Sequence, residues 1–344
     1  MMAGNTVMAG NTVMAGKSLL GQTADYSPWT EWDGGYWFPQ QASDYAADVD
    51  NLYNLIFWIS AVFFVLIVVP MAVFVVKYRR RPGYKRKPSH DHNLMLELAW
   101  SVGPTLILAW FFVEGVWGYL DMRTPPDSAS EYEIQVEASQ FAWKFTYPNG
   151  TVTTELVLPI NTPVKFRLQS VDVLHSFFIP QFRLKHDVVP GRYGMAWVNA
   201  TQSGTFRLYC AEYCGDGHSL MRRDVRVVDK TWDEVMKEIE WKFETHDSWE
   251  NGQYLYRINC SGCHSVDGSA KTGPTFLGSW GGTANTDRGA VPFDDNYVRE
   301  SILEPNAKVR SGFARPSAMP TFLGRLDDAE INYLIEFIKD PGRS

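Results

Sequence analysis

Cysteine is scarce in this chain, with four in 344 residues, at positions 210, 214, 260 and 263. They form two close pairs, and each pair lies in a motif of its own. No thiol is therefore left for the structural disulfides that stabilise small secreted domains. The two pairs instead indicate two separate chemical sites.

Positive charge is scarce at the start of the chain, where Lys17 is the only basic residue among the first fifty. No basic region followed by an apolar core is found there, so we expect no secretory signal peptide. The segment instead repeats Met-Ala-Gly-Asn-Thr-Val nearly twice over, which suggests a misassigned start. The formal net charge of -7 argues against nucleic acid as a partner.

Two long hydrophobic runs are present. Residues 55–76 are almost wholly apolar and residues 94–120 are nearly so. Each run is long enough to cross a hydrocarbon layer of roughly 30 Å as a helix. A buried core helix is the alternative, and it has more support in the second run, which carries Glu97 and Glu114. We predict a transmembrane hairpin with helices over about 54–78 and 94–120.

The short loop between the two runs, residues 77–87, is strongly basic. The positive-inside rule places such a loop in the cytoplasm. Both termini, and everything from about Asp127 onward, are then expected on the periplasmic or outer side. Tryptophan and tyrosine gather within residues 26–38, where they suit either the outer lipid interface or packing against a partner.

After the second run the chain changes to short β-branched segments separated by proline and glycine turns. This pattern predicts an antiparallel β-sandwich or barrel. The expected strands cover residues 133–138, 152–158, 164–168, 195–198, 205–209 and 224–228.

From Trp232 the apolar period becomes helical, with Val235, Met236, Ile239 and Phe243 on one face, which predicts a linker helix. The last hundred residues indicate a few short helices around long loops. Their core is too small to be stable without a prosthetic group.

The densest cluster of metal-binding side chains lies in residues 210–221, which hold two cysteines, His218 and Met221. Thiolate, imidazole and thioether groups are soft ligands suited to copper. His175 supplies a further imidazole, because a sandwich brings distant loops together at one end. The alternatives are a zinc fragment or a disulfide for the cysteines, and ordinary packing for the methionine.

The second pair belongs to Cys260-Ser-Gly-Cys263-His264, a motif typical of covalent attachment of a c-type haem. Two thioethers and one proximal imidazole exhaust the motif. One axial position of the iron is then left for another side chain. Together the two motifs indicate two redox centres in series.

The copper loop, His175 and residues 184–192 resemble subunit II of the haem–copper cytochrome c oxidases. The resemblance implies a dinuclear CuA centre on a cupredoxin sandwich anchored by two helices. Cys210 and Cys214 would bridge both coppers as thiolates.

The resemblance also assigns the remaining copper ligands. His175 and His218 would each bind one copper, with Met221 and the backbone carbonyl of Glu212 as weak axial ligands. Because every position is then filled, such a site passes electrons and does no substrate chemistry. The carboxylate of Glu212 would also help to hold a magnesium ion at the interface with subunit I.

Other positions follow the family less closely. Phe141 stands where the family usually has the tryptophan at which cytochrome c delivers its electron, and Trp143 and Tyr147 are further candidates beside a packing role. Glu97 matches an acid near a proton pathway into subunit I, and it also suits the start of a helix. His186 is expected either at the surface or in the layer of residues that surrounds the copper ligands.

The haem motif resembles that of class I cytochromes c. The carbonyl of Pro274 would accept a hydrogen bond from the proximal His264, which fixes the orientation of the ring. Met319, in a Met-Pro motif, is the expected distal ligand, and methionine raises the potential of a histidine-ligated haem. Met236 and His246 are the rival ligands.

The order of parts resembles the caa-type oxidases, in which the electron carrier is fused to subunit II. The implied fold class is a multidomain membrane protein with a two-helix hairpin, a cupredoxin-like all-β sandwich and an all-α cytochrome c domain. The expected divisions are an outward-facing segment (1–52), the hairpin (53–121), the cupredoxin CuA domain (127–229), a linker helix (230–247) and the cytochrome domain (248–344).

The implied function is relay of electrons from haem c to CuA and on to subunit I, where oxygen is reduced to water with proton pumping. The expected partners are subunit I, subunit III, membrane lipid, and an upstream donor such as a cytochrome c or a quinol-oxidising complex. The expected location is the bacterial inner membrane. The alternatives are a stand-alone membrane electron-transfer protein and a CuA-containing nitric oxide reductase subunit.

Overall fold

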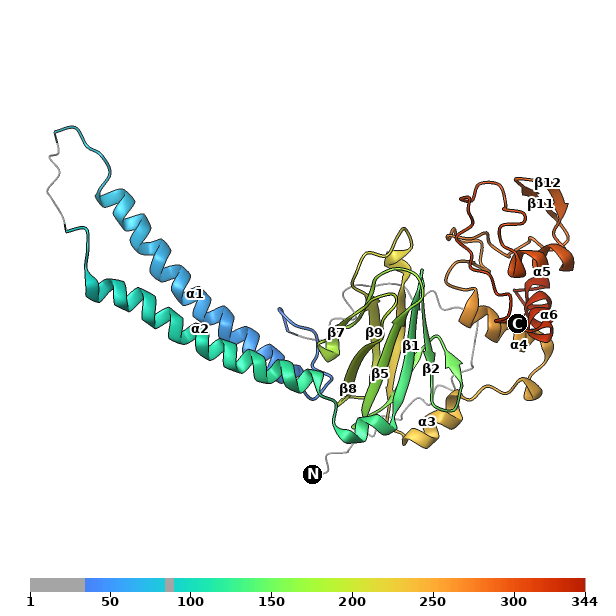
Figure 1. Ribbon diagram of the computed structural model, residues 1–344, viewed down its shortest axis with the longest axis horizontal. Helices are drawn as coiled ribbons and strands as arrows, with labels where there is room; N and C mark the ends of the chain where they lie inside the picture. Colours follow the sequence, from blue (N-terminus) through green and yellow to red (C-terminus); the bar gives the residue numbers. More distant parts are fainter. Residues whose placement is uncertain (1–34, 84–89, 344) are drawn as a thin grey trace, which may run out of the picture.

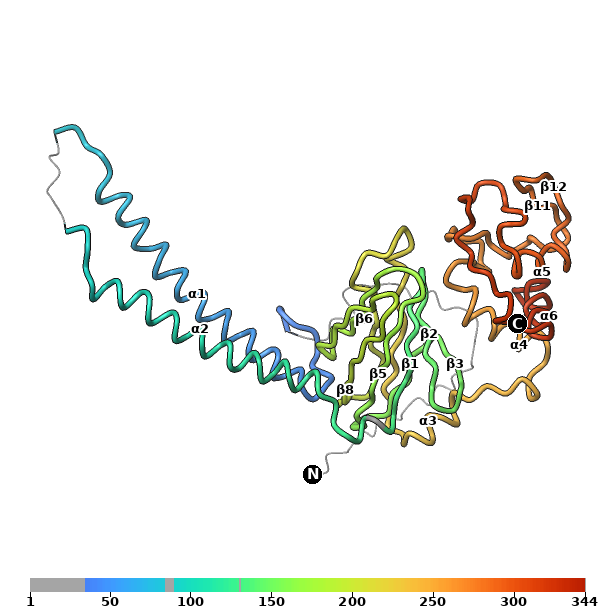
Figure 2. The backbone as a smooth tube through the Cα atoms, in the orientation of Figure 1, coloured from blue at the N-terminus to red at the C-terminus, as the bar shows by residue number. Residues whose placement is uncertain are grey.

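The structure is a computed structural model that describes residues 35–83 and 90–343. Figure 1 shows a pair of long helices, a β-sandwich and a helical C-terminal domain, with the sandwich between the other two parts. The tube in Figure 2 follows the chain from the helix pair through the sandwich into the C-terminal domain. The N-terminal repeat, Trp29, Trp32 and part of the basic run lie outside the described residues.

The helix pair consists of α1 (Ala46–Lys77) and α2 (Leu94–Arg123). The most apolar stretch of each has a mean hydropathy of 3.0 in α1 and 1.6 in the second helix, and none of either stretch is buried within the chain. Side chains such as Phe64 and Phe112 therefore face outward, as expected for contact with lipid or with another membrane subunit. Helix α1 begins earlier than predicted, because its first turns pack on the sandwich.

The sandwich consists of two five-stranded sheets, ordered β3-β2-β1-β5-β8 and β4-β10-β9-β6-β7. In β1 the side chains of Ile134, Val136 and Ala138 alternate into the core. The strands are β1 (Glu133–Ser139), β2 (Ala142–Thr146), β3 (Val152–Thr153), β4 (Leu156–Pro159), β5 (Pro163–Ser170), β6 (His175–Ile179), β7 (Leu184–Val188), β8 (Gly194–Asn199), β9 (Gly204–Cys210) and β10 (Arg222–Val228).

The sandwich differs from the prediction in two ways. It is not purely antiparallel, because β1 pairs in parallel with β5, and β10 pairs in parallel with β4. The segment predicted as one strand over residues 152–158 is split: β3 belongs to one sheet and β4 to the other. The chain bends at Thr154 and Glu155 and so changes sheets, which an alternation of side chains along the sequence does not reveal.

The linker helix is shorter than predicted. Helix α3 (Trp232–Ile239) begins with a capping box between Thr231 and Glu234, and it ends at Ile239, so the prediction of a helix over 230–247 is wrong beyond that residue. Phe243 lies in a separate 3-10 turn and packs with the C-terminal domain. The ring of Trp241 stacks on Tyr254 at 4.7 Å, which turns the chain toward that domain.

The C-terminal domain contains α4 (Ser248–Asn259), α5 (Asp295–Leu303) and α6 (Asp328–Lys339), with a hairpin of β11 (Thr283–Thr286) and β12 (Gly289–Pro292). Helices α4 and α6 cross at Gly252, where a Cβ atom would overlap the carbonyl oxygen of Tyr333. The rings of Tyr256 and Phe337 pack next to this crossing at 4.9 Å. The crossing forms one wall of the core that surrounds the haem motif.

Candidate copper and haem sites

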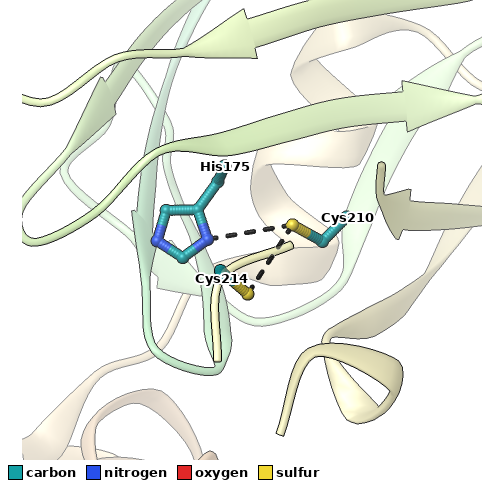
Figure 3. Close-up of side chains that lie close together, drawn as sticks. All are labelled: His175, Cys210 and Cys214. Atoms are coloured by element: carbon teal, nitrogen blue, oxygen red, sulfur yellow. Dashed lines mark hydrogen bonds between the residues drawn. The ribbon is translucent and has the colours of Figure 1, made fainter. Parts of the chain in front are cut away.

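The sandwich brings three of the predicted copper ligands together. Figure 3 shows the ring of His175 pointing toward the sulfur atoms of Cys210 and Cys214. Nδ1 of His175 lies 3.8 Å from Sγ of Cys210, and the two sulfur atoms are 3.9 Å apart. One ligand atom from each of these buried residues lies within 4.8 Å of the others.

Neighbouring strands explain why these residues meet. His175 is the first residue of β6 and Cys210 is the last of β9. These strands pair with Phe177 opposite Cys210, so a histidine and a cysteine that are distant in sequence lie at the same end of one sheet.

The loop after β9 adds three further donors. The carbonyl oxygen of Glu212 lies 3.2 Å from Sγ of Cys210. Nδ1 of His218 and Sδ of Met221 lie 3.5 Å and 3.8 Å from Sγ of Cys214. The two cysteine sulfur atoms and the four donors around them therefore bring all six predicted ligand groups together, and this largely soft donor set suits copper.

The side chains of the copper cluster differ in how readily they lose a proton. Burial opposes the charged form of His175, but its hydrogen bonds with Asp172 and Cys210 outweigh burial and raise its pKa to about 9. Burial likewise opposes ionisation of Cys210, yet the bond to His175 lowers the pKa of that thiol. Burial and the negative charge on Cys210 raise the pKa of Cys214. A metal must therefore displace protons from His175 and Cys214.

Asp172 orients the first histidine, a role that the sequence analysis missed. Its Oδ1 lies 2.8 Å from Nε2 of His175, which directs Nδ1 toward the sulfur atoms. The spacing Asp172-x-x-His175 was a usable signal, because a carboxylate three residues before a ligand can reach its outer nitrogen.

The aromatic candidates lie at different depths beneath the copper loop. The ring of Phe141 packs directly on Gly217, where a Cβ atom would overlap it. Trp143 is fully buried, 6.2 Å from the ring of His175, with its Nε1 donating to the carbonyl of Met221. Tyr147 is buried and its hydroxyl bonds both backbone groups of Val157, so it supports the sandwich core.

The haem motif faces a large apolar cavity in the C-terminal domain. Its empty space, part of which is open to solvent, amounts to about 1220 Å³, and its walls include both cysteines of the motif, His264 and Met319. Phe276 and Phe293 line the same space. A mostly apolar cavity with two thiols, an imidazole and a thioether fits a covalently bound haem.

The proximal histidine is held in one orientation. Nδ1 of His264 donates to the carbonyl of Pro274 at 2.8 Å, which leaves Nε2 free to bind iron. The ring stacks on Phe276 at 4.7 Å. Burial lowers the pKa of His264, so the imidazole is neutral, as a ligand must be. Gly273 is required beside it, because a Cβ atom there would lie 2.7 Å from Cε1 of His264.

The remaining candidates lie away from the haem cavity. Met236 packs on the sandwich, and His246 stacks on Trp241 at 3.7 Å, so neither lines the haem cavity. Glu97 accepts a hydrogen bond from the backbone of Asn93 and so caps the start of α2. His186 lies on β7, half-buried, with Nδ1 beside the carbonyl of Asp187.

A helix pair whose apolar stretches are exposed, a sandwich with a thiolate–imidazole cluster and a helical domain with a haem motif define a membrane-anchored electron-transfer protein. Three family models match the chain: "Cytochrome C oxidase subunit II, transmembrane domain" at residues 30–113, "Cytochrome C oxidase subunit II, periplasmic domain" at 132–228, and "Cytochrome c" at 249–340.

Curated relatives agree with these matches. Cytochrome c oxidase subunit 2 of Alkalihalophilus pseudofirmus is 32% identical over 297 residues, which cover 82% of this chain and 85% of the relative. The subunit 2 of Bacillus sp. (strain PS3) is 27% identical over 76% of this chain and 79% of its own length. The alternative cytochrome c oxidase subunit 2 of Bradyrhizobium diazoefficiens is 31% identical over 59% and 80%.

The chain belongs to the cytochrome c oxidase subunit II family, in the form that carries a fused cytochrome c domain. It is a membrane protein, a component of an oxidoreductase complex and a partner of subunit I. Its cofactors are CuA copper and haem c, and its function is electron relay to the haem–copper oxidase. The predicted fold class and function are confirmed.

Proposed function

We propose that the copper cluster is a dinuclear CuA centre with the six ligands expected from the sequence. Cys210 and Cys214 would hold both ions through their thiolates, and His175 and His218 would each hold one ion. Met221 and the carbonyl of Glu212 complete the set. The observation that supports this best is the arrangement of four donors around the two cysteine sulfur atoms, each of the four within 3.8 Å of a sulfur. Six donors exceed the four that a single tetrahedral metal takes.

In the haem domain, Cys260 and Cys263 would form the thioethers, and His264 and Met319 would hold the iron. When bound, the haem and the copper pair supply one-electron redox chemistry. The protein contributes an imidazole fixed by Pro274 and an apolar cavity around it. Because no coordination position is left for a substrate, both centres would only carry electrons.

The arrangement of domains supports a relay, because the sandwich lies between the haem domain and the membrane helices (Figure 1). We place both redox domains on the periplasmic side of the bacterial inner membrane, with the basic loop after Lys77 in the cytoplasm. Electrons enter at the haem from a cytochrome c or a quinol-oxidising complex, pass to CuA near Phe141 and Trp143, and leave for subunit I. The domain divisions of the sequence analysis are kept, with the helical part of the linker ending at Ile239.

Two further roles concern contacts with the other subunits. Glu212 is half-buried, and its carboxylate would bind a magnesium ion at the interface with subunit I. Glu97, which lies at the cytoplasmic end of α2 in this topology, feeds a proton path into the same subunit. Subunit III completes the complex.

Exchange of a ligand in each centre tests this division of labour. His218→Asn should abolish the near-infrared CuA band while the covalent haem remains bound. Met319→Ala should lower the haem potential and remove the methionine–iron band while CuA is kept. Optical and EPR spectra of the purified complex, which should also contain a-type haems, provide the measurement. Loss of haem c in His218→Asn, or the absence of a-type haems, would contradict the proposal.

A further inference from the structure

The copper site and the haem motif meet at one residue. Gln140 lies at the turn between β1 and β2. Its backbone N–H donates to Oδ2 of Asp172 at 2.7 Å, and its side-chain amide donates to the carbonyl of Cys214 at 2.5 Å. Its own carbonyl lies 3.4 Å from Sγ of Cys263. This residue therefore contacts the surroundings of both sites at once.

On the copper side, each contact leads directly to a ligand. Asp172 holds Nε2 of His175 at 2.8 Å, and Cys214 carries one of the two sulfur atoms of the cluster. The side chain of Gln140 also lies along the copper loop, since a Cβ atom on Gly215 would be 2.9 Å from its Nε2. Gln140 is thus one hydrogen bond away from the backbone of a copper ligand.

On the haem side, the motif lies directly on the start of β2. A Cβ atom on Gly262 would be 3.0 Å from Cβ of Ala142. Once a thioether forms at Cys263, its sulfur donates no proton, but it remains next to the Gln140 carbonyl. Both sides of the contact therefore lie in turns, Gln140 between β1 and β2 and Cys263 directly after α4.

Other contacts hold the haem domain against this face of the sandwich. Nζ of Lys144 donates to Oδ1 of Asn259 at 2.9 Å, and the hydroxyl of Tyr254 donates to the carbonyl of Val152 at 2.9 Å. Both Asn259 and Tyr254 belong to α4, the helix that leads into the haem motif. These two hydrogen bonds thus hold the haem domain against the sandwich close to the haem motif.

We propose that Gln140 is a positioning residue that holds the haem motif and the copper loop in contact for electron transfer. The proposal rests on the proposed function. The step moves one electron and no atom: the iron is oxidised by one electron and the copper pair is reduced by one. Between Cys263 and the backbone of Cys214, the route crosses only two non-covalent contacts, both made by Gln140.

The test uses the whole purified complex. In Gln140→Met the side chain keeps its length but loses the amide donor. Electron transfer from photoreduced haem c to CuA should slow by up to about fivefold, because loss of one hydrogen bond of ordinary net strength can lower the population of the docked arrangement by that factor. The optical bands of both centres should stay unchanged. Gln135→Met, the same exchange at an exposed position of β1, is the matched control and should keep the original rate.

A second variant tests the docking contact away from the copper loop. Lys144→Met removes the contact with Asn259, and it should slow the same transfer. It should also reduce the relaxation that the ferric haem induces in the CuA EPR signal, which reports the distance between the centres. A Gln140→Met protein with both bands and an unchanged rate would overturn the proposal. If Gln140→Met binds no copper, Lys144→Met provides the test instead. An unchanged transfer rate together with an unchanged relaxation of the CuA signal in Lys144→Met would then overturn the proposal.

Failure of the proposed function is a different result. In that case the unsubstituted complex itself lacks the CuA or the haem c signal, or transfers no electron between them.

Discussion

At the scale of single residues, the copper cluster depends on groups that bind no metal. Asp172 fixes the ring of His175 through Nε2 and keeps Nδ1 toward the sulfur atoms. Its carboxylate also accepts the proton on Nε2, which leaves Nδ1 to bind the metal and makes the neutral ring a more basic ligand. A residue that only orients a ligand should therefore control copper affinity.

Asp172→Asn tests this role. The amide retains the shape of the carboxylate but removes its charge, so the affinity for copper should fall about tenfold, the lower end of the range for groups that support a ligand. Competition of the loaded protein with a chelator, followed at the CuA band, measures the change. Asp229→Asn, at an exposed position after β10, is the control and should have no effect. Equal affinities of the two variants would refute the role of the charge.

The copper ligands were predicted from the sequence, whereas the residues that support them were missed or were placed only by the structure. Cys210, Cys214 and His218 lie close together in sequence, and their chemistry is specific. The contact of Phe141 with Gly217 joins two loops from different strands, so its geometry depends on the register of the whole sheet. Asp172 was missed because aspartates are common in surface loops.

At the scale of elements, the haem domain depends on the crossing of α4 and α6. The helices approach so closely at Gly252 that a Cβ atom would overlap the carbonyl oxygen of Tyr333. Glycine is needed here for space and not for its backbone conformation. The crossing buries Leu334 and Phe337, and Leu334 also lines the haem cavity.

Gly252→Ala should therefore destabilise the haem domain although alanine favours helices. We expect the free energy of unfolding to fall by about 1–3 kcal/mol, the usual effect of an added methyl group in a packed contact. A denaturant titration followed at the haem band gives the value. Gln253→Ala, the next residue of α4, is the control. A Gly252→Ala domain as stable as that control would show that the helices separate freely.

Element boundaries were predicted less well than element types. The linker helix was extended to residue 247 because Phe243 continued the apolar period of Val235 and Ile239. In the structure Phe243 packs on the C-terminal domain. Apolar residues that follow one helical period in the sequence therefore belong to two different hydrophobic cores. The residues 152–158 were merged for the same reason, since sequence alternation does not show which sheet a strand joins.

At the scale of the whole molecule, the sandwich is attached to the membrane helices by a buried ion pair. Nε and Nη2 of Arg183 donate to the two carboxylate oxygens of Asp50 at 2.7 Å. Their side chains are only 8% and 6% exposed. Arg183 also donates to the carbonyls of Pro39 and Pro180, at 2.7 Å each. Because Asp50 lies in the first turns of α1, this cluster sets the position of the copper centre relative to the membrane.

Arg183→Met should break this attachment. The unpaired Asp50 carboxylate would remain buried, and loss of one partner of a buried pair costs about 3–5 kcal/mol. The free energy of unfolding of the detergent-solubilised protein, followed at the CuA band, measures the loss. Arg192→Met, at an exposed position between β7 and β8, should change it little. The double variant Asp50→Leu/Arg183→Met should recover part of the loss, because no buried charge is left without a partner. If the double variant is as unstable as the sum of the single variants, the ion pair does not act as a unit, and the attachment depends on the surrounding backbone contacts instead.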